Sequence, residues 1–417
     1  MARMRIRYFW GMAGLGLALV LSACLAQRFK PAPEASVRSA PAARVTTDHP
    51  QFIYFTSDDV GLSGLPGSGG DGGLHFLTEL FAEHRNPSRR GDFRTFDGAP
   101  IHFTFFVNTY FLESGTDAAP AARERTGENP VSLKRAWKEA VSRGHEIALH
   151  THSHPHGSEF SVGQWRDEIR RNIDLLTRPW DPDEAPDRPN PASGLGLDRG
   201  VIQGFRAPFI EYNDNVFTAV GLEGLAYDSS IEEPVPSGAE GTGFDWPYRL
   251  DQGRPGGRPY VGSHPGLWEI PIYDFIVPDD EACPRYGLPA GLRARLKTIK
   301  EYFLPDYGGI TGMDWNLWNE FRLSPDEFLA TLKYTLERHL SGGRSPMIVG
   351  LHTDLYSDKR RTDEAGASPA ERRAVIREFL EFALSRPEVR IVSCRELLAW
   401  MNHQAAGREA ARPSNPE

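Results

Sequence analysis

Four histidines fall within seven residues of this chain, a density that points to metal binding. They are His150, His152, His154 and His156, and they follow a short apolar run at 146–149. Neutral imidazole is the commonest metal ligand that proteins offer. Positions 150 and 154 share one face of a helical turn, and 150, 152 and 154 share one face of a strand. A row of surface or backbone-bonded histidines would account for one of them but not for four, so we expect a metal site here.

Two adjacent carboxylates end a second apolar run. Residues 52–57 read Phe-Ile-Tyr-Phe-Thr-Ser, and Asp58 and Asp59 follow at once. Neighbouring like charges raise each other's proton affinity unless a cation lies between them. Without further evidence, the pair could equally well be a solvated acidic turn after a buried strand or part of a functional site.

Three more polar side chains stand where apolar runs end. Arg206 precedes Ala-Pro-Phe, Asp228 ends the run 225–228, and His352 follows the run 346–351. Each alone could be a cap or turn residue, although an Arg can clamp a carboxylate in fixed geometry. The carboxyl ends of parallel strands are where barrels and open sheets assemble active sites. We therefore expect all three to join Asp58 and His150 in one site.

The elements that must position these residues alternate along the chain. Helices are predicted to begin after Ser132, Ser161, Ser324 and Ser368. The last two serines belong to capping boxes with Pro at the first helical position. Alternation of strands and helices predicts an α/β fold with a parallel sheet, open or closed into a barrel. The predicted strands are 52–57, 102–107, 146–149, 203–206, 225–228, 268–273, 346–351 and 389–392.

One catalytic domain is expected over residues 51–403, with a disordered tail at 404–417. Three stretches rich in Gly, Pro or Asp are predicted to be loop insertions, namely 61–100, 178–200 and 232–266.

The N-terminus is typical of an exported protein. Arg3, Arg5 and Arg7 precede an uncharged run from residue 8 to residue 27. The run contains Leu-Ser-Ala-Cys24, which resembles the bacterial lipobox, so residues 1–23 are predicted to be a signal peptide and Cys24 to carry lipid. An uncleaved membrane anchor is the alternative, since about 20 apolar residues span a bilayer.

The residues after the lipid site bear on where the protein is held. Residues 24–50, rich in Ala and Pro, would tether the domain to the membrane. Leu25 favours sorting to the outer membrane, facing the periplasm of a Gram-negative bacterium.

Composition excludes some partners. The formal net charge is −9 at pH 7, with no basic face to displace counterions, which argues against a nucleic-acid binder. A net acidic protein suits a neutral or cationic glycan better than an anionic one. Three cysteines are too few for a disulfide framework. Whether Cys283 and Cys394 are bonded to each other is left open.

Taken together, these motifs resemble the polysaccharide deacetylases, carbohydrate esterase family 4, over roughly residues 52–400. The matching segments are 56–59, 104–107, 150–154, 206–209, Asp228 and 351–352, and the segments 206–209, 227–231 and 268–271 resemble the chitin-deacetylase branch. The resemblance implies a distorted (β/α) barrel of about seven parallel strands. It also implies a hydrolase that removes N-acetyl groups from an amino-sugar polysaccharide and releases acetate. A chitin-like chain, poly-N-acetylglucosamine or peptidoglycan would each fit.

The resemblance also assigns roles. Asp58 would be the general base, oriented by Arg206, and His352 the general acid, braced by Asp228. One divalent metal ion, for which zinc is favoured, would be held by Asp59, His150 and His154. This chain departs from the family in having Ser57 in place of an aromatic residue and in lacking an Asp-Trp pair directly after Asp228.

Two other readings stay open at this stage. A lipid-anchored carbohydrate-binding protein without activity would keep the groove but not the acid and base. Non-haem iron oxygenases also use two His and one carboxylate, but on all-β folds that this alternation disfavours. Trp268, Trp315 and Trp318 could stack on sugar rings, although core packing explains them equally well.

Overall fold

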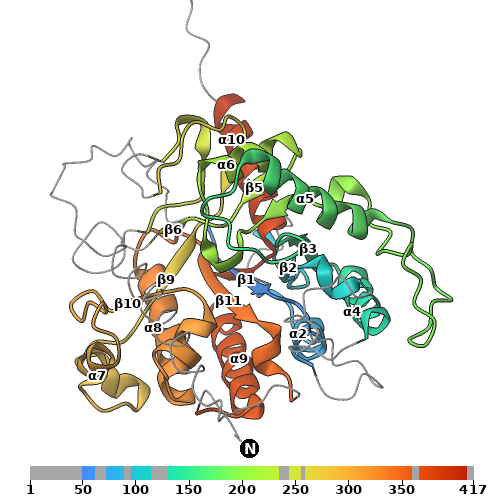
Figure 1. Cartoon of the computed structure of the whole chain (residues 1–417). Coiled ribbons are helices and arrows are strands. Elements are labelled where there is room, and N and C mark those ends of the chain that lie inside the picture. Colours follow the sequence, from blue (N-terminus) through green and yellow to red (C-terminus); the bar gives the residue numbers. More distant parts are fainter. Residues whose placement is uncertain are drawn as a thin grey trace, which may run out of the picture.

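The computed structural model describes residues 49–61, 72–88, 95–113, 129–233, 244–254, 259–358 and 366–410. Its strand β1 (Gln51–Asp58) belongs to a mostly parallel sheet (Figure 1) and pairs with three other strands. All eight residues of β1 are buried, as expected for a strand covered on both faces. The sheet order is β11-β1-β2-β3-β4-β5-β8-β7, and β12 also pairs with β1. The first seven strands of this order are mutually parallel, and β7 is antiparallel. Their bounds are β2 (Thr104–Val107), β3 (Glu146–Leu149), β4 (Gly204–Phe205), β5 (Tyr227–Asp228), β7 (Tyr248–Arg249), β8 (Trp268–Glu269), β11 (Met347–His352) and β12 (Val389–Ile391).

A second sheet continues the first and nearly closes the barrel. Its order is β10-β9-β6, formed by β6 (Glu232–Glu233), β9 (Ile272–Ile276) and β10 (Gly309–Thr311). Just beyond β10, the Gly350 amide of β11 donates to the Gly312 carbonyl at 3.0 Å. The sheet thus curls into the distorted (β/α) barrel of about seven parallel strands predicted from the sequence.

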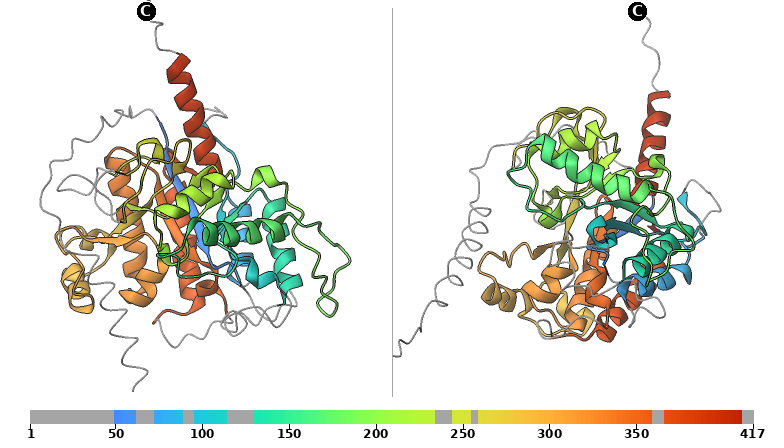
Figure 2. Two further views of the ribbon diagram at one scale, coloured as in Figure 1. Left: turned by 45° about the horizontal axis from the view of Figure 1, so that its top comes forward. Right: turned by 45° about the vertical axis from the view of Figure 1, so that its right-hand side comes forward.

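Two hydrophobic clusters lie on the two sides of the barrel wall. Alternate residues of β1 divide between them: Phe52 and Tyr54 belong to the inner cluster, and Ile53 and Phe55 to the outer one. The outer cluster is covered by helices that surround the barrel (Figures 1 and 2). These helices are α2 (Gly73–Ala82), α4 (Pro130–Ser142), α5 (Val162–Thr177), α6 (Asp214–Leu222), α7 (Leu292–Ile299), α8 (Pro325–Ser341) and α9 (Pro369–Leu384).

The predicted helix starts are confirmed in three of four cases. Ser161, Ser324 and Ser368 cap α5, α8 and α9, each with a complete capping box. Helix α4 begins at Pro130, and its cap lies three residues before Ser132, the cap predicted from the sequence. The Asn129 side chain caps it by accepting from the Val131 amide at 2.9 Å, and Pro130 occupies the first turn.

Some predicted loops contain regular structure. The segment 61–100 contains α2, whose apolar face is buried against the barrel. The segment 232–266 contains β6 and β7. The single strand predicted at 268–273 is divided into β8 and β9, because Pro271 between them has no amide hydrogen to donate.

Helix α10 (Cys394–Ala410) covers the end of the barrel where β1 begins. Leu397 and Leu398 are buried in the inner cluster, and the Trp400 ring lies 4.8 Å from that of Phe52. The helix then extends beyond the body of the protein (Figure 2). Residues 404–410, expected in a disordered tail, continue this helix, since they are mostly good helix formers such as Ala, Gln, Arg and Glu.

Candidate functional site

Strand alternation decides which predicted residues reach the barrel interior. Tyr54 on β1, Ala148 on β3 and Ile348 on β11 belong to the inner cluster. Since side chains alternate between faces, positions an even number of residues further along face inward as well. That places Asp58, His150 and His352 on the inner side at the carboxyl ends of their strands, and Phe205 in the outer cluster places Arg206 there too.

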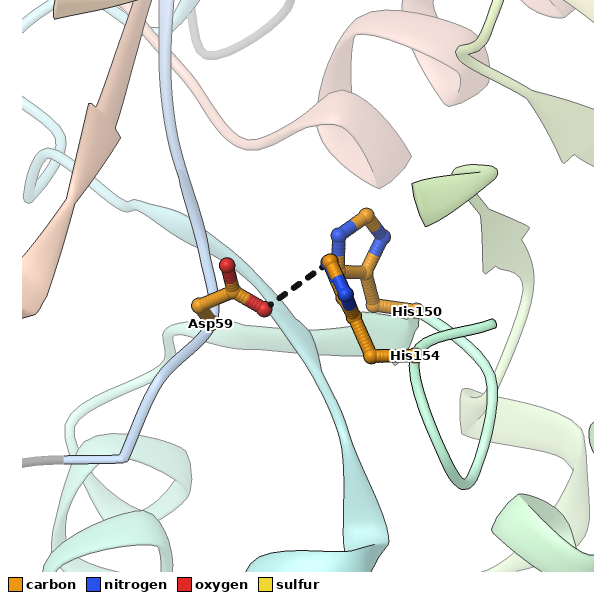
Figure 3. Close-up of side chains that lie close together, drawn as sticks. All are labelled: Asp59, His150 and His154. Carbon is orange, nitrogen blue, oxygen red and sulfur yellow. Dashed lines mark ion pairs between the residues drawn. The ribbon is translucent and has the colours of Figure 1, made fainter. Parts of the chain in front are cut away.

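Asp59, His150 and His154 come together as a possible metal site (Figure 3). One ligand atom from each lies within 4.8 Å of the others. His154 Nε2 is 3.2 Å from Asp59 Oδ1. His150 comes from the end of β3, His154 from the turn after it, and Asp59 from the residue after β1. The predicted ligand set is therefore brought to one place by two neighbouring segments.

The donor set fits a divalent cation. His150 Nδ1 donates to the Arg206 carbonyl at 2.8 Å, which leaves Nε2 as the nitrogen for a metal. Burial lowers the pKa of His150 to about 4, so its ring is neutral, as a ligand must be. Asp59 Oδ1 is buried and accepts no hydrogen bond from the described residues. Two imidazoles and one carboxylate suit zinc with a coordination position left open.

Strained backbone is concentrated at this site. Eight non-glycine residues have positive φ among those that the structure describes, and five belong to the site segments: Asp59, Thr151, His154, Phe209 and Ile210. A non-glycine residue in this region costs roughly 1–3 kcal/mol and persists only where its surroundings impose it. Such clustering is typical of a functional site.

Asp58 is held by a fully buried Arg206. The guanidinium Nη1 donates to Asp58 Oδ1 at 2.8 Å and to Thr56 Oγ1 at 2.9 Å. The other carboxylate oxygen, Oδ2, lies 3.8 Å from His150 Nε2, beside the metal ligands. Burial alone would raise the pKa of Asp58, but Arg206, His150 and His352 together lower it below its ordinary value. Asp58 is therefore ionised and can accept a proton.

His352 has the opposite electrostatic environment. Its Nδ1 donates to Asp314 Oδ1 at 2.7 Å, and its amide donates to Asp314 Oδ2 at 3.1 Å. Burial alone would lower the pKa of His352, but the hydrogen bond and charge of Asp314, with the charges of Asp58 and Asp59, raise it to about 9. His352 is therefore protonated at neutral pH and can donate a proton.

The expectation that Asp228 braces His352 does not match the structure. Tyr227 belongs to the inner cluster, so Asp228 points to the other side of the barrel wall. Its carboxylate accepts from the Ser230 amide at 2.8 Å and from Ser230 Oγ at 3.1 Å. The carboxylate that contacts His352 is Asp314.

Asp314 was missed in the sequence, although it carried a signal. It is followed by Trp315, which makes an Asp-Trp pair of the kind found in the family, as residues 245 and 246 also do. The Asp314–Trp315 pair lies far beyond Asp228 in the chain, just after the three-residue strand β10. Trp315 is 37% exposed and its ring lies 6.2 Å from that of His352, so it can contact a substrate.

The other two tryptophans differ from Trp315. Trp318 is buried and packs on Phe328 with ring centroids 4.5 Å apart. Trp268 is half-buried beside the inner cluster. Core packing is thus the role of Trp318.

Other groups that could do chemistry are less suited to it. His75, Glu79 and Glu139 also lie close enough for a metal, but Arg143 pairs with both glutamates, at 2.5 and 2.9 Å. Two surface cavities of about 370 and 390 Å³ lie beside α8 and contain none of the site residues above. Cys283 and Cys394 are buried free thiols.

The sequence comparisons agree with this geometry in one segment. Residues 93–183 match the family model described as polysaccharide deacetylase. The chain thus contains a segment of polysaccharide deacetylase type. The matched segment includes His150 and His154, whereas Asp58, Asp59 and Arg206 lie outside it. A comparison with curated proteins finds no match.

Solved structures with a similar arrangement are distant in sequence. A Mycobacterium smegmatis protein classed as a polysaccharide deacetylase is 17% identical, with a TM-score of 0.47, covering 93% of this chain and 100% of that one. The Puue allantoinase is 15% identical, with a TM-score of 0.46 and coverage of 91% and 98%. A Pseudomonas aeruginosa PAO1 protein, also classed as a polysaccharide deacetylase, is 14% identical, with a TM-score of 0.46 and coverage of 90% and 99%.

The predicted signal peptide, lipidation at Cys24 and most of the tether lie outside the described residues. Within the described ranges, we find no helix with the length and apolar character needed to cross a membrane.

Proposed function

We propose that this chain is a metal-dependent hydrolase that removes N-acetyl groups from an amino-sugar polysaccharide and releases acetate. The main support is the pair of opposed proton-transfer groups beside one ligand set. Asp58 is kept ionised by Arg206, and His352 is kept protonated by Asp314. Amide hydrolysis needs one group to take a proton and another to give one.

The metal ion we propose is zinc, held by Asp59, His150 and His154. When bound, such an ion would acidify a water molecule and polarise the acetyl carbonyl. Asp58 Oδ2, on the side of His150, accepts the proton that the attacking water loses. Arg206 holds the other oxygen, Oδ1, and so fixes the direction in which the carboxylate faces.

His352 completes the reaction at the leaving group. Its Nδ1 is engaged by Asp314, so Nε2 is the nitrogen that gives a proton to the departing amine. The carbon–oxygen bond to water forms, the carbon–nitrogen bond breaks, and acetate and a free amino sugar result. The order of roles is the same as the resemblance implied, with Asp314 in place of Asp228.

The test is acetate release from a panel of acetylated oligosaccharides, measured with and without a chelator. We expect release that is abolished by chelation and restored by zinc. His154→Ala should lose metal, whereas the matched variant His156→Ala should keep it, because the exposed His156 side chain pairs with Glu211 instead. Glycan binding without acetate release by zinc-loaded protein would instead support the inactive carbohydrate-binding alternative.

We also propose that lipid on Cys24 attaches the protein to the bacterial envelope, at the outer membrane and facing the periplasm. The support is the basic start, the apolar run and the lipobox-like Leu-Ser-Ala-Cys24. Stable anchoring requires more than one acyl chain, which a bacterial lipoprotein carries. Cys24→Ala should abolish lipid labelling and processing, and unchanged labelling of this variant would overturn the proposal.

A further inference from the structure

Asp228 and Glu269 form a buried pair of carboxylates that the mechanism above does not use. They are register partners on the adjacent parallel strands β5 and β8, so their side chains lie on the same side of the barrel wall. Both residues are 0% exposed. Neither forms an ion pair with Lys or Arg among the described residues, in contrast to Asp58.

Hydrogen bonds account for three of the four carboxylate oxygens. Asp228 Oδ1 accepts from the Ser230 amide at 2.8 Å, and Oδ2 accepts from Ser230 Oγ at 3.1 Å. Glu269 Oε1 accepts from the Ile231 amide at 3.0 Å. Glu269 Oε2 is buried with no donor in the described part of the chain.

We propose that Glu269 is protonated and donates from Oε2 to Asp228, and that this acid–carboxylate pair is a positioning device for Arg206 and thus for Asp58. The role in catalysis rests on the proposed function. Two adjacent buried carboxylates without a cation cannot both be ionised. Burial raises the pKa of both residues, that of Asp228 to about 6 and that of Glu269 well above its ordinary value, so Glu269 holds the proton.

The link to Arg206 passes through the turn that follows β5. Asp228 accepts from the amide of Ser230 and Glu269 accepts from the amide of Ile231, the two residues that directly follow Ser229 in this turn. Ser229 in turn receives two bonds from Arg206, from Nε to its carbonyl at 2.9 Å and from Nη2 to Oγ at 2.9 Å. Ser230 Oγ also accepts from the Ala207 amide at 2.8 Å, next to Arg206. The turn thus holds both the side chain of Arg206 and the backbone of the residue that follows it.

Removing the pair should therefore misdirect Arg206 without touching the metal ligands. Glu269→Ala removes the carboxylic acid that donates to Asp228. It also removes the oxygen that accepts from the Ile231 amide. A misplacement of about 1 Å in a catalytic group can cost about 100-fold in rate. We expect kcat to fall by roughly 10- to 100-fold, with KM and metal content unchanged.

Glu269→Gln is the matched control. Its amide nitrogen can donate to Asp228 and its oxygen can accept from Ile231, so it reproduces the protonated state of Glu269. We expect kcat within about threefold of the wild type. A Gln variant as impaired as the Ala variant would overturn the proposal, since it would mean that an ionised Glu269 is required.

Infrared spectroscopy tests the shared proton whether or not the Ala variant folds. The wild type at neutral pH should show the carbonyl stretch of a buried protonated carboxylic acid, and Glu269→Gln should lack it. Absence of that band from the wild type would overturn the proposal. If the wild type releases no acetate from any glycan, the proposed function fails, but the band and the distance from Arg206 to Asp58 in a crystal structure of Glu269→Ala still test the pair.

Discussion

Asp58 and His352 are register partners at the ends of the adjacent strands β1 and β11, and burial shifts the pKa values of their side chains in opposite senses. Burial favours the uncharged form of each, and so would raise the pKa of the carboxylate and lower that of the imidazole. In both cases the partner reverses the effect of burial. Arg206 keeps Asp58 charged, and Asp314 keeps His352 charged. A base and an acid are thus poised at the same pH.

The Asp228–Glu269 pair shows what happens without such a partner. It is as buried as Asp58, but no Lys or Arg of the described residues forms an ion pair with it. Burial then dominates, and the pKa of Asp228 rises to about 6. The comparison teaches that the partner across the contact, and not burial itself, decides which carboxylate can act as a base.

The largest effects are expected when one member of the Asp58–Asp59 pair is neutralised at a time. Asp58→Asn should lower kcat by about 100- to 10,000-fold with metal retained, because only the base is removed. Asp59→Asn should instead lose metal, and excess zinc should recover part of its activity. Metal analysis beside acetate release checks both variants. Metal loss in Asp58→Asn with metal retained in Asp59→Asn would reverse the two roles.

Removing the cation beside Asp58 should narrow the active pH range from the acid side. In Arg206→Gln, the guanidinium no longer opposes the effect of burial, so the pKa of Asp58 rises. The acid limb of the pH profile should therefore lie at a higher pH than in the wild type. We expect a loss of kcat milder than that of Asp58→Asn, because the base is still present. The pH profile of kcat/KM measures this shift. An unchanged acid limb would show that Arg206 does not control the ionisation of Asp58.

Removing the carboxylate beside His352 should narrow the range from the alkaline side. His352 must be protonated to act, so activity falls as the pH rises through its pKa of about 9. Asp314→Asn should move this limb toward the ordinary histidine value of about 6.5. The same pair stabilises the fold, fully below pH about 6.5 and no longer once the pH has risen through about 9.

The control for that experiment is Asp228→Asn. It removes a carboxylate that does not contact His352, so the alkaline limb should stay in place even if kcat falls. A shift in Asp228→Asn and none in Asp314→Asn would restore the role that the sequence suggested for Asp228.

The smallest effect is expected at the rim of the site. Trp315→Ala should raise KM by roughly 2- to 10-fold, the worth of one aromatic contact, with the alkaline limb unchanged. The melting temperature should change little, since the side chain is 37% exposed. Trp318→Ala should instead lower stability by about 3–5 kcal/mol, because that ring is buried in the core. A KM that does not respond to Trp315→Ala would exclude a substrate contact.

What the sequence predicted correctly follows from one property of its strands. β1, β3 and β11 are apolar runs long enough to be recognised, and each ends directly in a polar residue on the inner side. The fold class and the convergence of Asp58, His150 and His352 could therefore be predicted from residue types and order.

The residues that escaped prediction lie beside weak strands. β10 has three residues, one of them Gly, so nothing marked Asp314 as lying at a strand end. β5 has two residues, and its alternation could not be read, so the side of the wall reached by Asp228 was unknown. Glu269 was noted only as part of a motif, because its partner across the sheet is not visible in a linear sequence.

The direction of β1 has a consequence for how a tethered protein would face its surroundings. The eight residues from Gln51 to Asp58 span about 26 Å, so the chain enters at one end of the barrel and the reactive groups lie at the other. If Cys24 carries lipid as proposed, the tether joins the barrel at the amino-terminal end of β1, opposite to the proposed active site. The 27 residues from Cys24 to Pro50 could span at most roughly 95 Å, and the reactive groups would lie at the end of the barrel opposite to the one that they join. The reactive end of the barrel would then be the end more distant from the point of attachment, which suits glycan strands held away from the membrane.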